Sequence, residues 1–132
     1  MSDLFDSKDP VVESMDELSE ALVEVIEENP ECYWKPKNQE KIKVDDMTDT
    51  HLYNLYNYLH RAHEATEEHD PEFYEAFFGG LDSWEYVVQT AKIVYIFNKI
   101  ESVMRKRGIP FEKKTGFLLD HQYLFKDDQG EK

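Results

Sequence analysis

Eight acidic side chains near the start of the chain recur at a spacing that would gather them on one side of a helix. At 100° per residue they fall in a single sector, opposite an apolar stripe formed by Met15, Leu18, Leu22, Val25 and Ile26. Such a surface could bind basic groups of a partner, because carboxylates attract and pair with Lys and Arg side chains. We call this set the acidic face, and it consists of Glu13, Asp16, Glu17, Glu20, Glu24, Glu27, Glu28 and Glu31.

The spacing within the acidic face is unfavourable for the helix that carries it. Five pairs of these carboxylates stand four residues apart, and each like-charge pair of this kind costs a helix about 0.2–0.5 kcal/mol. Carboxylates four residues apart are separated by about 6 Å along the axis, close to two base steps of one DNA strand at about 3.4 Å each. The pattern favours a surface for a basic partner, in the extreme a mimic of a phosphate backbone. The alternative is a solvated face that promotes solubility.

A histidine-rich group forms the second candidate site. His60, His63, Glu64 and Glu67 stand three or four residues apart, so that adjacent members could reach one metal ion from one face of a helix. Their order differs from that of a zinc-protease helix, in which two histidines four residues apart enclose the catalytic glutamate. His63 also falls on the apolar stripe of its helix, which favours a buried, hydrogen-bonded histidine. Metal binding by this group is the alternative.

The other reactive residue types lack the neighbours that catalysis requires. Gly79 and Gly80 are not followed by the Lys and Ser or Thr of a phosphate-binding loop, and no serine lies in a nucleophile elbow. Cys32 follows Glu31, whose negative charge disfavours the reactive thiolate. The sequence therefore predicts a protein with no catalytic residues and no cofactor.

The aromatic content exceeds what one small core needs, and part of it could anchor a partner. The chain has 8 Tyr, 8 Phe and 2 Trp, and Tyr and Trp offer large, rigid contact surfaces. Tyr58 points away from the stripe of Leu52, Leu55 and Leu59 on a helical wheel, so we assign it to the partner-binding surface together with the acidic face. The basic residues at 105–107 and 113–114 are better explained by the negative end of a helix dipole and by pairing with the acidic helix.

Caps and apolar spacing predict the helices that position these residues. The expected helices cover about residues 14–29, 48–68, 71–78 and 83–107. The first begins with a capping box at Ser14 and Glu17, and the last begins with a second one at Asp82 and Glu85. Between residues 87 and 97 the last helix is apolar on almost every side, which is typical of a helix covered by others.

Two segments outside the helices complete the expected fold. Residues 32–44 combine short extended runs with a polar turn and predict a small β-hairpin, and the apolar run over 117–125 predicts a packing arm or an edge strand. The fold class is mainly α, a compact helical bundle around the central long helix. With 132 residues the chain is expected to form a single domain, with frayed ends at 1–10 and 127–132.

The composition excludes several classes of function. The chain has 29 Asp and Glu against 15 Lys and Arg, a net charge of −14, and residues 1–31 hold 11 acidic side chains and one basic side chain. This charge opposes direct binding to nucleic acid or to an anionic membrane, which depends on Lys and Arg. The single cysteine and the lack of a signal peptide or apolar span lead us to expect a cytoplasmic protein.

The middle of the chain resembles a pattern found in small proteins encoded by bacteriophages. Trp34, a polar turn at 38–39, the run over 42–44 and the segment DMTDTHLYN at 46–54 are similar to a tryptophan strand, a turn and a "DMTDSHLxN" helix start that recur in that class. The similarity covers residues 34–61, and the glycine of the turn is absent. It implies a phage origin and, by class, a role in inhibiting host or defence proteins.

Together these patterns predict a non-enzymatic, acidic protein-binding module. Its acidic face would dock on a basic surface of a host or defence protein in the host cytoplasm, without direct contact to nucleic acid or membrane. Two alternatives stay open. One is a metal-binding protein or metal-dependent enzyme that uses His60 and His63, and the other is a self-associating structural or assembly protein, for example a homodimer.

Overall fold

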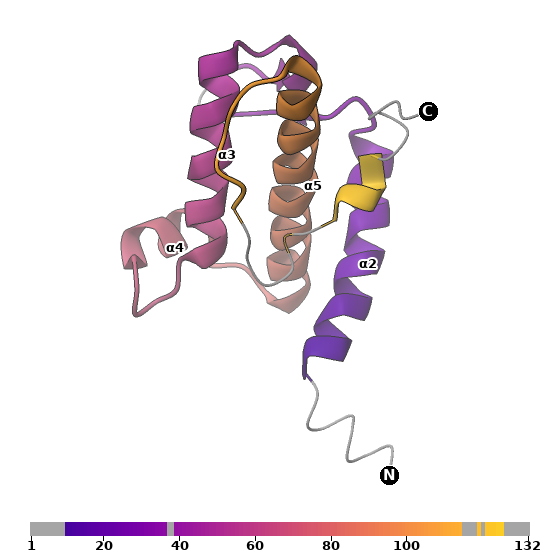
Figure 1. Ribbon diagram of the computed structural model, residues 1–132. Coiled ribbons are helices and arrows are strands. Elements are labelled where there is room, and N and C mark those ends of the chain that lie inside the picture. The colour runs from indigo at the N-terminus through magenta and orange to yellow at the C-terminus, as the bar shows by residue number, and fades with distance from the viewer. Residues whose placement is uncertain (1–9, 37–38, 115–118, 120, 126–132) are drawn as a thin grey trace.

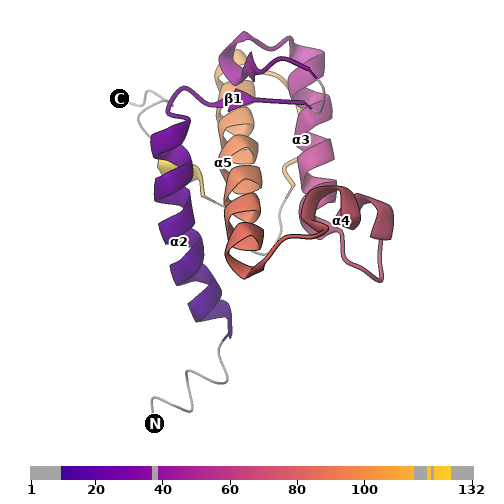
Figure 2. The ribbon, with the colours of Figure 1, turned by 180° about the vertical axis from the view of Figure 1, so that it is seen from behind.

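The long helix α5 (Ser83–Arg107) lies at the centre of the computed structural model, and the other elements cover it (Figure 1). Helix α2 (Pro10–Glu28) lies along one side of α5 and helix α3 (Asp49–Glu64) along another (Figures 1 and 2). The short helix α4 (Pro71–Phe78) lies beside α3, near the start of α5. The structure describes residues 10–36, 39–114, 119 and 121–125. The predicted fold, mainly α and organised around a central long helix, is confirmed.

A small antiparallel hairpin bridges the helices. Strand β1 (Tyr33–Trp34) pairs with β2 (Ile42–Lys43), with Tyr33 opposite Lys43 and Trp34 opposite Ile42. Figure 2 shows β1 crossing α5 between α2 and α3. A 3₁₀ turn, η1 (Val44–Asp46), then leads into α3. The hairpin expected within residues 32–44 is thus confirmed.

Helix α5 is buried on all of its faces over most of its length. Every residue from Ile93 to Met104 is buried. Because a helix has 3.6 residues per turn, the side chains of this segment point in every direction around the axis, and all of those directions are covered. Helix α2 covers it with Leu18, Leu22 and Val25. Helix α3 covers another side, and its buried residues are Leu52, Leu55, Tyr56, Leu59 and Ala62.

The ends of α5 and the start of α3 follow their sequence signals. Asp82 and Glu85 form the predicted capping box: the Glu85 N–H donates to Asp82 Oδ1 at 2.8 Å, and the Asp82 N–H donates to Glu85 Oε1 at 3.1 Å. Gly108 ends α5 with φ +72°, a left-handed conformation that glycine adopts without strain. Thr48 caps α3, where its Oγ1 accepts a hydrogen bond from the His51 N–H.

Two helix boundaries differ from the prediction. Helix α2 begins at Pro10 and not at about residue 14, so Ser14 lies inside the helix and is not its cap. Proline is favoured in the first turn, where its fixed φ suits a helix and its missing N–H costs nothing. Helix α3 ends at Glu64 and not at about residue 68. The following residues turn back on themselves, because Thr66 N–H donates to the His69 carbonyl at 2.8 Å.

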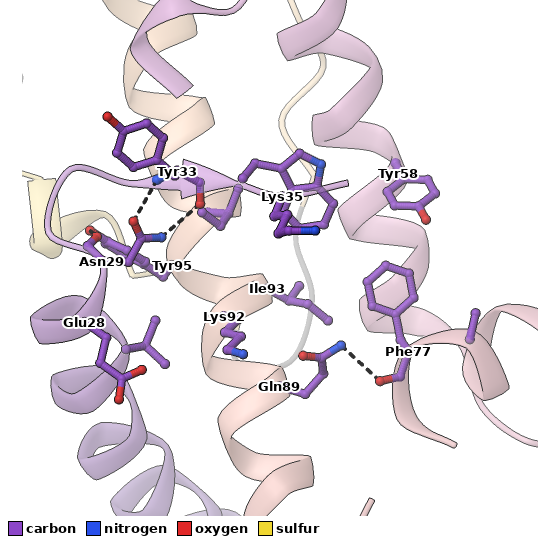
Figure 3. Close-up of a pocket in the computed structure, with 14 residues that line it drawn as sticks. Glu28, Asn29, Tyr33, Lys35, Tyr58, Phe77, Gln89, Lys92, Ile93 and Tyr95 are labelled. Atoms are coloured by element: carbon purple, nitrogen blue, oxygen red, sulfur yellow. Dashed lines mark hydrogen bonds between the residues drawn. The ribbon is translucent and has the colours of Figure 1, made fainter. Parts of the chain in front are cut away.

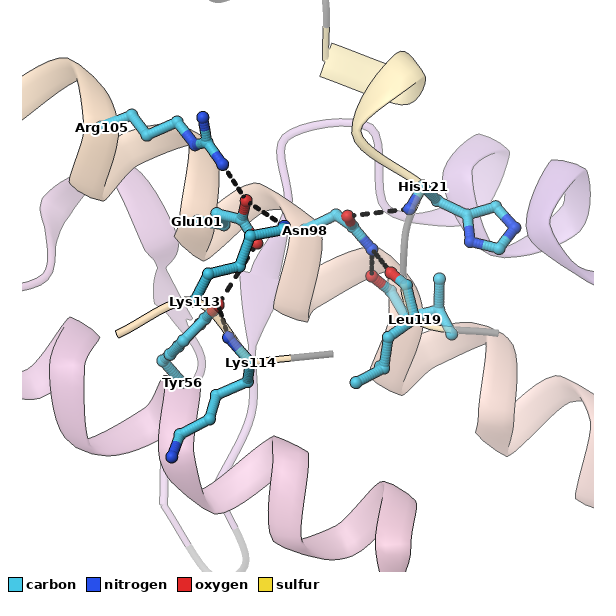
Figure 4. A network of polar contacts seen from close by, with 9 residues as sticks. Tyr56, Asn98, Glu101, Arg105, Lys113, Lys114, Leu119 and His121 are labelled. Atoms are coloured by element: carbon cyan, nitrogen blue, oxygen red, sulfur yellow. Dashed lines mark hydrogen bonds and ion pairs between the residues drawn. The ribbon is translucent and has the colours of Figure 1, made fainter. Parts of the chain in front are cut away.

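A buried carboxylate on α5 connects three parts of the fold (Figure 4). Glu101 is fully buried, and its Oε2 accepts hydrogen bonds from Arg105 and, at 2.7 Å, from Lys113. Its Oε1 lies 3.3 Å from the hydroxyl of Tyr56 on α3, and that hydroxyl in turn accepts the Lys114 N–H. Burial raises the pKa of the Tyr56 hydroxyl to about 12, so this group stays protonated at neutral pH.

Asn98, about one turn before Glu101, holds the C-terminal segment against α5 (Figure 4). Its Nδ2 donates to the Leu119 carbonyl at 2.7 Å, and its Oδ1 accepts the His121 N–H at 3.0 Å. Leu119 and Phe125 are buried there, with Phe125 in the 3₁₀ turn η2 (Gln122–Phe125). The described part of the predicted 117–125 arm therefore packs on α5 as a turn and not as an edge strand.

Parts of the prediction lie outside the described residues. These are positions 37 and 38 of the expected hairpin, positions 117, 118 and 120 of the expected arm, and the ends at 1–9 and 126–132. Within the described ranges, no helix combines the length and the apolar character needed to cross a bilayer.

The Glu101 network predicts a clear effect on stability. Glu101→Gln removes the charge that receives both Arg105 and Lys113, and hydrogen bonds to charged groups contribute about 1.5–3 kcal/mol. We expect the free energy of unfolding to fall by about 2 kcal/mol in urea denaturation. The exposed Glu112→Gln is the control, for which the change should stay within about 0.5 kcal/mol. Equal effects of the two substitutions would contradict a stabilising role for the network.

Candidate functional site: the acidic face and its surroundings

Packing on α5 determines which side of α2 faces outward. Leu18, Ala21, Leu22 and Val25 are buried against the core, so the opposite side of the helix points to solvent. Glu13 and Asp16 belong to the same helix, and their side chains lie outside the described part. The acidic-face residues whose side chains are described are all exposed, namely Glu17, Glu20, Glu24, Glu27, Glu28 and Glu31.

Most of these carboxylates have no basic partner among the residues that the structure describes. Glu31 is paired with Lys43 at 3.2 Å, and its hydrogen bond and charge raise the pKa of Lys43. The other five form no ion pair with any residue that the structure describes. The last turn of α2 also contains no basic residue, although cations are favoured at that end of a helix. These five carboxylates therefore present a concentrated negative charge that no described basic side chain compensates.

An apolar groove borders the N-terminal part of the acidic face, and the sequence alone did not reveal it. The groove has a volume of about 430 Å³ and lies between α2 and the start of α5, where Glu17, Leu81, Tyr86 and Val87 line it. Leu81 and Tyr86 are 37% and 42% exposed, and the neighbouring Trp84 is 39% exposed. Aromatic side chains this exposed are available as anchors for a partner.

Among the side chains that the structure describes, the basic residues near the end of α5 do not pair with the acidic face, contrary to the prediction. Arg105 binds Glu101, and Arg107 binds Asp49 at 2.9 Å and the carbonyl oxygens of Asp45 and Met47 at 2.7 Å. The contacts of Arg107 join the end of α5 to the start of α3 and to the residues just before it. Because Arg105 and Arg107 pair with these groups, they are not available to neutralise the carboxylates of the acidic face.

Tyr58 is exposed as predicted, but its ring has a structural role as well. It lies 5.0 Å from Phe73 and 5.6 Å from Phe77, both on α4. Arg61 stacks over Phe73 and donates to Asp70 at 2.7 Å, which lowers the pKa of Asp70. Tyr58 thus helps to hold α4 against α3.

The histidine-rich group is not assembled on one helix face. Glu67 lies beyond the end of α3 and so loses the helical spacing on which the metal alternative depends. His60 Nε2 and Glu64 Oε2 are 3.9 Å apart, and His63 is half-buried. Across the described ranges, no group of three or more His, Cys, Asp and Glu side chains could hold a metal ion.

A second, larger hollow is separate from the apolar groove. This cavity, of about 580 Å³, opens between α2, β1, α5 and the α3–α4 pair (Figure 3). Aromatic residues line it, among them Trp34, Tyr58 and Phe77, together with Lys35 and Lys92. Patterns in the sequence could not reveal this cavity, because its walls come from segments far apart in the chain.

No family model matches the chain, and neither a curated protein nor a solved structure matches it. Its function is therefore inferred from its own geometry.

The uncompensated carboxylates lead to a prediction about stability. Glu24 stands four residues from both Glu20 and Glu28, so Glu24→Gln removes two repulsive pairs of about 0.2–0.5 kcal/mol each. We expect the free energy of unfolding to rise by about 0.5 kcal/mol in urea denaturation at low salt, and less at high salt. Glu31→Gln is the matched control, because it breaks the pair with Lys43 and should not stabilise the protein. A loss of stability in Glu24→Gln would show that the acidic face supports the fold.

Proposed function

We propose that this protein is a non-enzymatic protein-binding module whose acidic face docks on a basic surface of a partner. The observation that carries the proposal is the exposure of Glu17, Glu20, Glu24 and Glu27 without a basic partner in the described part of the chain. Like charges at this spacing destabilise the helix, and a binding role explains why such a costly arrangement is present. Attraction between opposite charges would speed the encounter with the partner.

The groove beside the acidic face supplies the second half of the interaction. Charged contacts at the rim of an interface mainly affect the rate of encounter, whereas buried apolar anchors slow dissociation. Leu81 and Tyr86 are exposed and line the groove together with Glu17, at one end of the acidic face. A partner that places basic side chains along α2 and an apolar side chain in the groove would use both.

The bacteriophage resemblance and the spacing of the carboxylates support a more specific form of the proposal. In that form the protein inhibits a host or defence protein by occupying a basic groove that otherwise binds nucleic acid. Successive carboxylates along α2 at about 6 Å intervals would take the place of phosphates spaced at about 3.4 Å per nucleotide.

Charge reversal on α2 tests the proposal. A variant in which Glu17, Glu20, Glu24 and Glu27 are replaced by Lys should no longer capture the partner protein that the wild type captures from bacterial lysate at low salt. Wild-type capture itself should weaken strongly at high salt. The control carries the same reversal at four other exposed carboxylates, Glu67, Glu68, Glu72 and Glu112, and should retain the captured protein.

The two variants have the same net charge, so they separate a specific surface from a general electrostatic effect. If both lose the captured protein equally, attraction is non-specific and the proposal fails. If both retain it at low and high salt, the acidic face is a solvated surface.

A further inference from the structure

The cavity beside β1 differs from the rest of the molecule in its local charge. Its charged lining residues within the described part of the chain are Glu28, Lys35 and Lys92, a local excess of positive charge in a protein whose net charge is −14. Neither Lys35 nor Lys92 forms an ion pair with a described residue. Two such ammonium groups at one cavity favour an anionic ligand.

Part of the cavity wall is aromatic. Tyr58 from α3 and Phe77 from α4 lie next to each other there, with their ring centres 5.6 Å apart, and Trp34 of β1 also lines the space (Figure 3). Tyr58 is 45% exposed, so part of its ring is accessible. Planar heterocycles stack on such rings, at a gain of about 1–3 kcal/mol for a nucleic-acid base.

Polar groups in the cavity are held in fixed orientations. Gln89 Nε2 donates to the Phe77 carbonyl at 3.0 Å, which leaves Gln89 Oε1 as an acceptor for a ligand (Figure 3). At the other end, Asn29 is bonded twice to the backbone of Tyr33 at 2.9 Å, and its carbonyl accepts the Tyr95 hydroxyl at 2.7 Å. These bonds fix the junction of α2 and β1, so this wall is formed before a ligand arrives.

We propose that this cavity binds a nucleotide, with its base against the aromatic wall and its phosphate against Lys35 and Lys92. The aromatic surface would stack on the base, and the two ammonium groups would bind the phosphate. The free amide oxygen of Gln89 would accept a hydrogen bond from a donor on the edge of the base. The volume of about 580 Å³ is within the range of small-ligand sites. The acidic-face residue that lines this cavity is Glu28, and the proposed ligand contacts involve none of the carboxylates assigned to docking at Glu17, Glu20, Glu24 and Glu27.

Tryptophan fluorescence provides a direct test. The chain has 2 Trp, so Trp84→Phe leaves Trp34, in the cavity wall, as the only reporter. In this background we expect adenosine or guanosine 5′-monophosphate to quench the emission saturably. Adenosine or inorganic phosphate alone should bind at least tenfold more weakly, because each satisfies only one part of the site. An unchanged emission with all mononucleotides would overturn the proposal.

Lysine variants then locate the phosphate. Lys92→Ala should weaken mononucleotide binding about tenfold, the effect of one lost charge-assisted hydrogen bond. Lys106→Ala, an exposed lysine at the far end of the same helix, is the control and should change the affinity less than twofold. Equal effects of the two substitutions, or equal affinity for adenosine and its monophosphate, would contradict the assigned phosphate position.

The variant with Lys at Glu17, Glu20, Glu24 and Glu27 separates this proposal from the docking function. None of these four residues lines the cavity, so the variant should bind mononucleotides with at least wild-type affinity even where it has lost its protein partner. A loss of mononucleotide binding in this variant would show that the cavity depends on the acidic face and would overturn the independence of the two sites.

Discussion

Helix α5 can be stable in water only when other elements cover it on every side, and this constraint organises the whole protein. The run from Ile93 to Met104 is buried without interruption, so no face of this segment is left for solvent. Helices α2 and α3, the η1 turn and the C-terminal segment each cover part of it. Because α2 must turn its apolar side toward α5, its acidic side is forced outward. The candidate interaction surface is thus a direct consequence of how the core is closed.

The polar groups buried on α5 add direction to this packing. Glu101 accepts hydrogen bonds from Arg105 and Lys113, and Asn98 forms two hydrogen bonds with the backbone of the C-terminal segment. Apolar contacts are non-directional, whereas these bonds have defined geometry and so specify where the two chain segments lie. They also occupy basic side chains in internal pairs. The negative charge on the outward side of α2 therefore remains largely unopposed.

The sequence predicted those features whose signals are local. The predicted positions of both ends of α5 are correct. A capping box at Asp82 and Glu85 defines the start and a glycine at 108 defines the end, and both signals come from residues that are close in the sequence. The apolar stripe of α2 likewise placed its carboxylates on the solvent side. The end of α3 was wrong, because it depends on the turn between Thr66 and His69 and on the pairing of Arg61 with Asp70. The cavity and the apolar groove combine distant segments, which periodicity along one helix cannot bring together.

The central claim is that carboxylates on α2 bind basic groups of a partner directly. Carbodiimide cross-linking tests this claim, because it joins a carboxylate to a lysine amine only when the two are in contact. With the captured partner, we predict cross-links from its lysines to Glu17, Glu20, Glu24 or Glu27, mapped by mass spectrometry and lost at high salt. Cross-links confined to carboxylates elsewhere in the chain, with these four unmodified, would contradict the account.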